Sequence, residues 1–375
     1  MKILLTGGGT GGHFYPLMAV AKALNAVADQ EKIANLELVY MAEHPYDRNI
    51  LLQNGIKFKK IYSGKIRRYF SFLNVIDAAK LIPGVLKSIF GMYLDFPDVV
   101  FSKGGYESFP PVLAARILGI PIMIHESDAI PGKANVWAGK FAKRIAVSFD
   151  GSAEYFPKGN AAVAGNPIRK EFFIREVLGA KEYFKLEDGT PTIFIFGGSQ
   201  GAKNINDNVL DILPELLPDY QIIHQCGENN YQECRGRADL ILENLPFKNR
   251  YKLFSSLEFD EMRMAYGAAD LAVSRAGSGS IFEIAASGLP SIIIPLDGSA
   301  QEHQRENAYA YAKSGAAAVM EEYNLKPHIL KSEIDRLFAG KEEMMNMSEA
   351  AKQFSKPDAA EKIAREIIRL AIEHK

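Results

Sequence analysis

A strand-like segment, a glycine-rich turn and a helix-like segment follow one another twice in this sequence, and this repeated unit limits the possible fold most strongly. In the first unit, residues 2–6 are short and apolar, and residues 7–12 are rich in glycine. The apolar stripe that follows at helical spacing consists of Leu17, Val20, Ala21, Leu24 and Val27. In the second unit, residues 192–196 and 197–201 repeat the strand and the turn. The second stripe consists of Ile205, Val209, Ile212 and Leu216. Strand, glycine turn and helix in this order open a doubly wound domain, so the sequence predicts an α/β protein with two Rossmann-like domains.

Further strand and helix segments fill both halves. Strands are expected at 99–101, 121–125, 271–274 and 291–295, and helices at 111–118 and 281–287. The turn Gly165-Asn166-Pro167 is the candidate hinge, which separates residues 1–164 from residues 165–357. The final segment, 358–374, places Ile363, Ile367, Ile368 and Ala371 on one stripe and predicts an amphipathic docking helix.

Length and composition exclude several classes of protein. A chain of 375 residues exceeds the size at which one hydrophobic core keeps growing, which favours two domains. The formal net charge of −1 argues against nucleic acid as a partner. The two cysteines, Cys226 and Cys234, lack a second ligand pair at metal spacing and are expected to be reduced thiols. The apolar stretch at the N-terminus is too short for a signal-peptide core, and no apolar run reaches the length of a spanning helix. We therefore expect a cytoplasmic protein that can meet a membrane only at its surface.

The first glycine turn could hold a phosphate. Glycine lets backbone N–H groups approach an anion, which also lies at the positive end of the next helix. The turn lacks the spacing of a dinucleotide fingerprint and the Gly-Lys-Ser/Thr of a P-loop. His13 stands at the head of the helix and could take a proton from an attacking hydroxyl. A helix-entry histidine bonded only to backbone is the alternative.

The other turns offer further candidate ligands for an anionic group. Ser199 and Arg169 could bind a diphosphate, although Arg169 could equally pair with a carboxylate such as Glu171. Glu283 follows the turn 275–280 and could accept both hydroxyls of a ribose, or serve only as a partner of the helix dipole. Gln304 and Asn307, after the strand at 291–295, could bind sugar hydroxyls or belong to a solvated loop. No Asp-x-Asp pair follows a strand, so neither a metal nor a cofactor is expected.

A basic segment rich in aromatic residues lies between residues 57 and 87. Its eight cations are Lys57, Lys59, Lys60, Lys65, Arg67, Arg68, Lys80 and Lys87, set against the single acid Asp77. Tyr69, Phe70, Phe72 and several leucines and isoleucines stand among them. Such a surface suits an anionic bilayer. The same apolar residues could instead be the core face of one or two helices.

Together these motifs resemble the MurG family. The matching blocks are GGGTGGHFYPLMAVAKAL, SKGGYESFPPVLAARILGIPIMIHESDAIPG, GNPIR, GGSQGAKNIN, SRAGSGSIFEIAASGLPSIIIPL and HQRENA. Six ordered blocks in both predicted domains are far more specific than one glycine turn.

The resemblance implies a GT-B fold in which the last helix, 358–375, returns to the N-terminal domain. It implies transfer of N-acetylglucosamine from UDP-GlcNAc to the C4 hydroxyl of undecaprenyl-diphosphate-MurNAc-pentapeptide (lipid I), with inversion, to give lipid II. This step belongs to peptidoglycan synthesis, cell shape and cell division. It places the protein at the cytoplasmic face of the cell membrane as a peripheral protein, with cell-wall and division proteins as possible partners. A UDP-GlcNAc 2-epimerase of the same architecture is the alternative, but it needs no lipid surface.

The family's functional positions carry over by motif. For the donor the resemblance implies Thr10, Gly11, Gly12, Asp128, Arg169, Ser199, Phe259, Ser278, Gly279, Ser280, Ile281, Phe282, Glu283 and Gln304. Phe259 is expected beside uracil, Glu283 on the ribose and Gln304 on the GlcNAc hydroxyls. The acceptor and membrane surface is assigned to Lys65, Arg67, Arg68, Tyr69, Phe70, Phe72 and Tyr106. His13 is the first candidate for the catalytic base, assisted by Asp128 or Glu126.

The sequence departs from the family pattern in two places. The familiar His-Glu-Gln-Asn is here His125-Glu126-Ser127-Asp128, so a carboxylate replaces an amide that contacts the sugar. A carboxylate accepts a hydrogen bond from a hydroxyl but cannot donate one. The loop before His303 is about one residue longer than in the family, which shifts its register.

Overall fold

The chain folds into two compact units. The computed structural model describes residues 1–64, 72–174, 178–198, 201–298 and 302–374, with side chains in the first helix after residue 71 described from residue 81 onward. Unit 1 comprises Met1–Arg169 and Lys356–Lys375, and unit 2 comprises Lys170–Ser355.

Unit 1 is built on a seven-stranded parallel sheet in the order β3-β2-β1-β4-β5-β6-β7. Its strands are β1 (Lys2–Thr6), β2 (Glu37–Ala42), β3 (Ile56–Lys60), β4 (Val99–Ser102), β5 (Ile122–Glu126), β6 (Arg144–Val147) and β7 (Ala161–Val163). The central strands are buried almost throughout and mostly apolar, because helices cover both faces of the sheet. The predicted strands at 2–6, 99–101 and 121–125 are confirmed to within one residue at each end.

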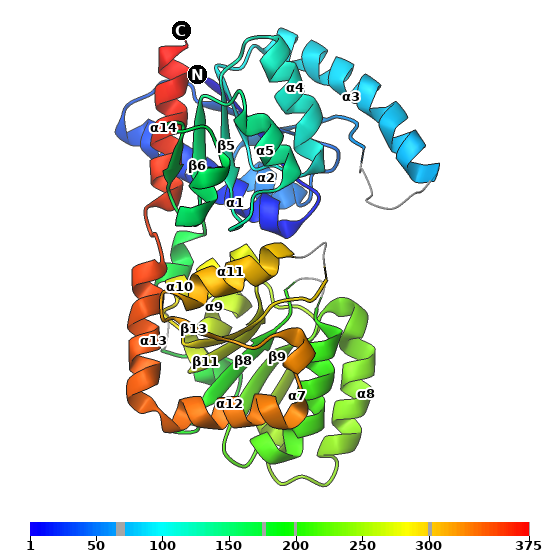
Figure 1. Cartoon of the computed structure of the whole chain (residues 1–375), viewed down its shortest axis with the longest axis vertical. Helices are drawn as coiled ribbons and strands as arrows, with labels where there is room; N and C mark the ends of the chain where they lie inside the picture. Colours follow the sequence, from blue (N-terminus) through cyan, green and yellow to red (C-terminus); the bar gives the residue numbers. More distant parts are fainter. Residues whose placement is uncertain (65–71, 175–177, 199–200, 299–301, 375) are drawn as a thin grey trace. The chain divides into compact units, whose positions relative to one another are not determined.

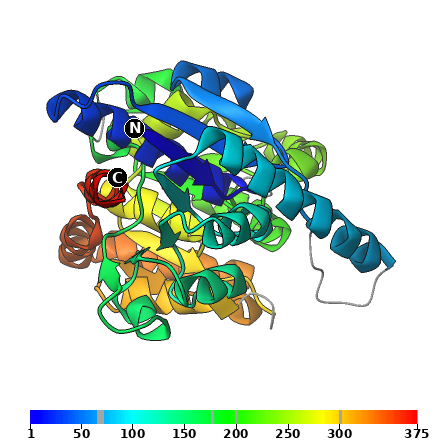
Figure 2. The same cartoon turned by 90° about the horizontal axis from the view of Figure 1, so that it is seen from above.

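Helices of unit 1 connect these strands. They are α1 (Gly11–Gln30), α2 (Arg48–Gln53), α3 (Phe72–Asp95), α4 (Phe109–Ile117) and α5 (Lys133–Gly139), with short 3-10 turns η1 (Tyr106–Ser108) and η2 (Asp150–Tyr155). The stripe predicted on α1 is buried at all five positions. Figures 1 and 2 both show α3 extending outward from the rest of unit 1.

The last helix, α14 (Ala359–Glu373), completes unit 1 by packing against α1. The predicted stripe of Ile363, Ile367, Ile368 and Ala371 is at most 1% exposed and joins the same core as Leu17 and Val20. On its rim, Arg365 pairs with Glu31 at 2.8 Å. The amphipathic pattern therefore docks this helix within unit 1.

Unit 2 repeats the architecture with a six-stranded parallel sheet in the order β10-β9-β8-β11-β12-β13. Its strands are β8 (Thr192–Phe196), β9 (Gln221–Gln225), β10 (Tyr251–Phe254), β11 (Leu271–Arg275), β12 (Ser291–Ile294) and β13 (Ala317–Val319). Its helices are α6 (Ala180–Tyr183), α7 (Lys203–Leu216), α8 (Tyr231–Leu242), α9 (Phe259–Ala268), α10 (Ser278–Ala286), α11 (Glu302–Ala312), α12 (Pro327–Ala339) and α13 (Lys341–Phe354). The short turns are η3 (Lys170–Phe173), η4 (Glu228–Asn230), η5 (Lys248–Arg250) and η7 (Glu322–Asn324). Cys226 and Cys234 are both buried as free thiols, as predicted.

In both sheets the first strand lies in the middle, and the chain leaves it in opposite directions. β1 pairs with β2 and β4, and β8 pairs with β9 and β11. A sheet that reverses its winding in this way opens a crevice between the two diverging connections, at the carboxyl ends of the strands. This is where α/β proteins bind ligands. The glycine turns that follow β1 and β8 stand at these two positions.

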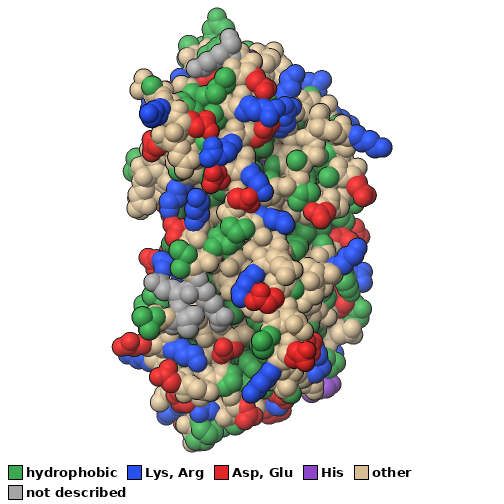
Figure 3. Space-filling view, turned by 90° about the vertical axis from the view of Figure 1, so that its left-hand side faces the viewer, with side chains coloured by type: hydrophobic (Ala, Val, Ile, Leu, Met, Phe, Trp, Pro, Cys, Tyr) green, Lys and Arg blue, Asp and Glu red, His purple; other side chains and the backbone are tan. Residues whose placement is uncertain are grey.

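The surface carries charges of both signs. On the face drawn in Figure 3, basic and acidic side chains are interspersed, in keeping with the formal net charge of −1.

The docking of α14 leads to a stability prediction. Ile367→Ala removes a side chain buried against α1 and should lower the free energy of unfolding of unit 1 by about 2–5 kcal/mol. The matched control, Ile372→Ala, changes a residue of the same helix that is 56% exposed and should change it by less than about 0.5 kcal/mol. The chain has one tryptophan, Trp137 in unit 1, so its fluorescence in a urea titration reports the unfolding of this unit. Equal effects of the two substitutions would contradict the docked arrangement.

Candidate functional site

The glycine turn of unit 1 packs against the loop that follows β4. Gly7 and Gly9 have φ values of 125° and 91°, which favour glycine. A Cβ atom on Gly9 would lie 2.6 Å from Cε1 of Tyr106, and one on Gly7 would lie 2.9 Å from Cβ of Lys103. The turn therefore needs glycine both for its backbone conformation and for the close approach of its neighbour.

His13 lies in the first turn of α1, beside this loop. Its Nδ1 is 2.9 Å from the hydroxyl oxygen of Thr10, and its backbone N–H donates to the carbonyl of Thr10 at 3.1 Å. A Cβ atom on Gly105 would lie 3.4 Å from Nε2 of His13, so the far ring nitrogen faces the loop after β4. If Nδ1–H donates to Thr10, Nε2 carries the lone pair that a general base needs.

The electrostatic surroundings favour the neutral imidazole. Burial, together with the positive charge of Lys103, lowers the pKa of His13 to about 4, while the charge of Asp128 acts in the opposite direction. His13 is therefore uncharged at neutral pH. This is the protonation state in which a histidine accepts a proton.

Glu126 organises the loop that carries Asp128. One carboxylate oxygen accepts from the backbone N–H of Asp128 at 2.9 Å. The other accepts from the N–H of Gly132 at 3.0 Å and from the amide of Asn135 at 2.8 Å. Burial and the charge of Asp128 raise the pKa of Glu126. With both oxygens engaged in this way, Glu126 supports the loop, whereas Asp128 is partly exposed.

Tyr106 and Arg169 flank the same turn of unit 1. The ring of Tyr106 lies over Gly9, and its hydroxyl donates to Glu107 at 3.1 Å. The guanidinium of Arg169 lies 4.9 Å from the centre of the Tyr15 ring, in the first half of α1. Together with Thr10, Gly11 and Gly12, these residues line the carboxyl edge of β1 and β4.

In unit 2, the glycine turn after β8 is also tightly packed. A Cβ atom on Gly197 would lie 2.4 Å from the backbone nitrogen of Ala202, and one on Gly201 would lie 2.2 Å from the carbonyl oxygen of Cys226. The turn leads into α7, whose N-terminal cap, Ala202, supplies no side-chain hydrogen bond. Backbone N–H groups at such a helix start are suitable donors to an anion.

The turn after β11 leads into α10, whose predicted residues divide into two groups. Ser278, Gly279 and Ser280 form its first turn behind Gly277, which provides no side-chain cap. Glu283 is partly exposed and accepts a hydrogen bond from the Tyr266 hydroxyl at 3.3 Å. Ile281 and Phe282 are at most 2% exposed, so their side chains belong to the core of unit 2 and only their backbone is available at the surface.

Phe259 and Gln304 lie in other connections of unit 2. Phe259 begins α9, is partly exposed, and packs edge-on against Phe172 at 5.3 Å between ring centres. Gln304 accepts from the backbone N–H of Leu296 at 3.3 Å, which ties α11 to the loop after β12.

The prediction that Asn307 could bind a sugar hydroxyl is corrected. Asn307 is fully buried, and its amide donates to the carbonyl of Ala276, so it supports the turn before α10.

Sequence reasoning missed two charged groups at these edges, a partly exposed glutamate and a buried lysine. Glu322 pairs with Arg275 and accepts from the N–H of Asp297 at 2.9 Å, which joins the loops after β11 and β12. Lys103 is 1% exposed at the end of β4, and its ammonium donates to the hydroxyl of Ser127. The only available signal for Lys103 was a cation directly after an apolar strand.

Several predicted residues lie outside the described parts of the chain. These are Lys65, Arg67, Arg68, Tyr69, Phe70 and Ser199; Phe72 begins α3, but its side chain is not described.

The second half of α3 is described and carries an exposed apolar face. Ile82, Leu86, Phe90, Tyr93 and Leu94, and Phe96 just beyond the helix, are 62% to 68% exposed.

Gly84, on the inner side of α3, lies too close to its neighbour for any side chain. A Cβ atom there would lie 2.0 Å from the carbonyl oxygen of Tyr62. Lys87 lies 4.9 Å from the centre of the Tyr62 ring. Within the described residues, no helix is both long and apolar enough to cross a membrane.

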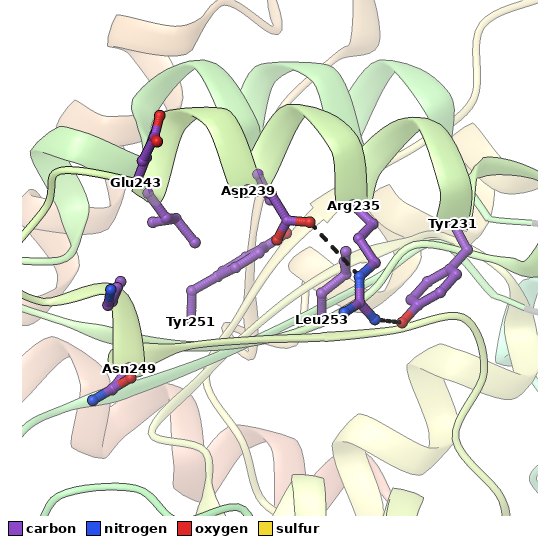
Figure 4. A pocket seen from close by; sticks show the side chains of 10 residues that line it. Tyr231, Arg235, Asp239, Glu243, Asn249, Tyr251 and Leu253 are labelled. Carbon is purple, nitrogen blue, oxygen red and sulfur yellow. Dashed lines mark hydrogen bonds and ion pairs between the residues drawn. The ribbon is translucent and has the colours of Figure 1, made fainter.

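A groove of about 420 Å³ lies between α8 and the edge strand β10 of unit 2. Figure 4 shows Arg235 between Asp239 and Tyr231, with the Arg235 guanidinium 3.0 Å from the Tyr231 hydroxyl. None of the residues that line this groove belongs to the glycine turns after β8 or β11. It is therefore separate from the candidate site.

Over the ranges that the structure describes, no group of three or more His, Cys, Asp and Glu residues is arranged to hold a metal ion.

Comparison with known proteins decides the family. The glycosyltransferase family 28 N-terminal domain matches residues 3–147, and the family 28 C-terminal domain matches residues 192–363. A relative from Clostridium kluyveri is 37% identical over 352 residues, covering 93% of this chain and 95% of the relative. That relative is named UDP-N-acetylglucosamine–N-acetylmuramyl-(pentapeptide) pyrophosphoryl-undecaprenol N-acetylglucosamine transferase, the activity of MurG enzymes. The chain belongs to the MurG family.

Other MurG relatives and solved structures agree with this assignment. A Treponema denticola transferase of the same name is 34% identical over 371 residues, covering 93% of this chain and 92% of the relative. The crystal structure of Acinetobacter baumannii MurG has a TM-score of 0.74 at 26% identity, covering 98% of this chain and 99% of that chain. A UDP-GlcNAc 2-epimerase from Neisseria meningitidis has a TM-score of 0.68 at 14% identity, with all of both chains covered. At that identity the epimerase shares only the fold. The predicted GT-B fold and MurG membership are confirmed.

The environment of His13 leads to a titration prediction. In histidine-labelled protein, the NMR signals of His13 should titrate with a pKa of about 4, because burial and Lys103 disfavour the imidazolium. Below that pKa the ring gains a proton and loses its function as a base. The substitution His13→Gln identifies the signal of His13, and His328→Gln, at an exposed position of α12, identifies a second signal. A His13 signal that titrates near pH 6.5, the ordinary value for histidine, would contradict this environment.

Proposed function

We propose that this protein transfers N-acetylglucosamine from UDP-GlcNAc to the C4 hydroxyl of undecaprenyl-diphosphate-MurNAc-pentapeptide (lipid I), forming lipid II and UDP. The main support is its similarity over almost the full length to transferases that carry this activity in their name. The glycine turns at the winding reversals of both sheets agree with it, because each provides a place for a phosphate or a sugar. The reaction belongs to cell-wall synthesis and hence to cell shape and division.

Unit 2 is assigned the nucleotide. Backbone N–H groups of the turn after β8 and of Ser278, Gly279 and Ser280 at the start of α10 suit the diphosphate. Arg169 and Ser199 add donors to the same group. Glu283 is assigned to the ribose hydroxyls, Phe259 to the face of uracil and Gln304 to the GlcNAc hydroxyls. Ile281 and Phe282 contribute through their backbone only, since their side chains are buried.

Unit 1 is assigned the acceptor and the proton transfer. The acceptor O4 forms a bond to C1 of the sugar from the side opposite the phosphate, and the bond between C1 and the phosphate oxygen breaks. The hydroxyl proton passes to Nε2 of His13, which is uncharged at neutral pH. Thr10 orients the ring, Asp128 is placed to accept from a sugar hydroxyl, and Glu126 holds the Asp128 loop in position. Thr10, Gly11, Gly12 and Tyr106 border this part of the site.

The charge of the departing UDP requires stabilisation without a metal in this proposal. Helix N-termini, backbone N–H groups and Arg169 can supply it. The reaction requires no cofactor, since UDP-GlcNAc is itself a substrate. Omitting and then adding divalent metal tests this part of the proposal directly.

The exposed apolar face of α3 is assigned to the cytoplasmic surface of the membrane. Six large apolar side chains more than 60% exposed on and beside one helix form an unusual surface for a protein in water. The cations of the segment 57–87 favour anionic lipid, at about 1 kcal/mol for each cation near the surface. A peripheral position of this kind brings unit 1 to a lipid-anchored acceptor. Cell-wall and division proteins are further candidate partners.

The proposed reaction is tested by incubating labelled UDP-GlcNAc with the protein and lipid I. Labelled lipid II and UDP are expected in equal amounts, with or without EDTA. Without lipid I, no UDP-ManNAc is expected, which separates the transferase from the epimerase of the same architecture. Release of UDP-ManNAc, or no label in the lipid fraction, would contradict the proposal.

In the same assay, His13→Ala should lower kcat by about 10²–10⁴-fold, the usual contribution of a general base. Binding of UDP-GlcNAc should change little. His328→Ala, on the exposed side of α12, serves as the control.

The membrane assignment leads to a binding prediction. Replacing Leu86 and Phe90 on α3 by serine should reduce co-sedimentation with vesicles of anionic phospholipid, because both side chains are more than 60% exposed. Leu240→Ser, at a 76% exposed position of α8 in unit 2, should leave co-sedimentation unchanged. Equal loss in both variants, or in neither, would show that α3 does not contact the bilayer.

A further inference from the structure

A lysine buried at the end of β4 is the least expected feature of unit 1. Lys103 is 1% exposed, and its ammonium donates to the hydroxyl of Ser127 in the loop after β5. A buried ammonium is costly unless opposite charges and hydrogen bonds compensate it. Such a residue at the carboxyl edge of the sheet therefore calls for a specific reason.

Four other titratable groups act on this lysine or are affected by it. Glu126 and Asp128, at the end of β5 and in the loop after it, favour its charge and partly offset the effect of burial, which lowers the pKa of Lys103 to about 8. His13 in α1 and His125 in β5 are both disfavoured as cations by burial and then by Lys103. Lys103 thus stands among two acids and two histidines.

The contacts of Lys103 connect it to both Asp128 and His13. Ser127, which accepts its hydrogen bond, directly precedes Asp128. On its other side, a Cβ atom on Gly7 would lie 2.9 Å from Cβ of Lys103, so this lysine packs against the glycine turn that leads to His13. Asp128 adds a negative charge near the buried Glu126, and the ammonium of Lys103 offsets it.

We propose that Lys103 is a positioning residue of the transferase, whose buried ammonium balances the carboxylate of Asp128 and sets the electrostatic surroundings of His13. It acts on the reaction through these two residues and through Ser127, without contacting the reacting atoms. Its effect on catalysis rests on the proposed function, whereas its effect on His13 does not.

The proposal explains how unit 1 can have an acid and an uncharged base side by side. The charge of Asp128 alone favours protonation of His13, whereas Lys103 opposes it. Burial is the larger influence and leaves His13 uncharged at neutral pH, while Asp128 can accept from a sugar hydroxyl. Removing one charge disturbs this balance, and removing both restores it.

A double-mutant cycle tests this balance. The variants are Lys103→Met, Asp128→Asn and the double variant, with Lys103→Gln as a second single variant that keeps a donor but loses the charge. Lys143→Met is the matched control. Lys143 is exposed and directly precedes β6, at the amino ends of the strands, whereas Lys103 follows the carboxyl end of β4. For each protein we would measure the NMR titration of His13, the pH dependence of kcat/KM, and unfolding by the fluorescence of Trp137.

The expected result is opposite shifts that cancel. Lys103→Met and Lys103→Gln should raise the pKa of His13, Asp128→Asn should lower it, and the double variant should return it towards the wild-type value. The acidic limb of kcat/KM should move in the same directions. Lys103→Met alone should lower kcat at least about tenfold, and the double variant should recover to within about threefold of the wild type, as expected when both members of a buried pair are replaced.

Two outcomes would overturn the proposal: a His13 titration unchanged in both Lys103 variants, or losses in kcat that multiply in the double variant. If Lys103→Met does not fold, as judged from Trp137, then Lys103→Gln carries the test. If the wild type transfers no sugar, the proposed function fails. The His13 titrations still decide whether Lys103 controls the charge of this histidine.

Discussion

The turn after β1 packs directly against the loop after β4, and this close contact requires glycine in the turn. A side chain at Gly7 or Gly9 would collide with Lys103 or Tyr106, and both glycines need φ values that other residues rarely adopt. This contact fixes the start of α1 and therefore the position of His13. The same contact brings Lys103 close enough to influence the charge of His13. Backbone sterics and electrostatics are thus coupled at a single junction of two loops.

Much of the fold followed from the sequence because its signals were local. A short apolar strand, glycine and a helical stripe are all read within about thirty residues, and the structure places them within a residue or two of the prediction. The docking stripe of α14 was equally clear. Its partner, however, was implied by the family resemblance and could not be read from the stripe itself.

The site was less predictable because burial depends on distant parts of the chain. Asn307 has the chemistry of a sugar ligand, yet its amide supports the carbonyl of Ala276 from inside unit 2. Ile281 and Phe282 follow a turn predicted to bind the donor, but the period of α10 directs their side chains into the core. The burial of Lys103 likewise depends on a distant part of the chain, because its ammonium bonds to Ser127, a residue more than twenty positions away.

The comparison with the epimerases shows how little the fold alone says about chemistry. A 14% identical epimerase shares the arrangement of both sheets, so the reaction depends on side chains at their carboxyl edges. In this chain those side chains include Lys103, Glu126 and Asp128 of unit 1.

The packing of α14 against α1 also has a consequence for synthesis on the ribosome. Every residue of unit 2 is translated between β7 and α14, so the nascent chain must leave the apolar side of α1 uncovered during that whole interval. Unit 2 has no such delay, because its sequence is continuous. The half of the protein made first is therefore the last to mature, and its unfinished form is a natural client for chaperones.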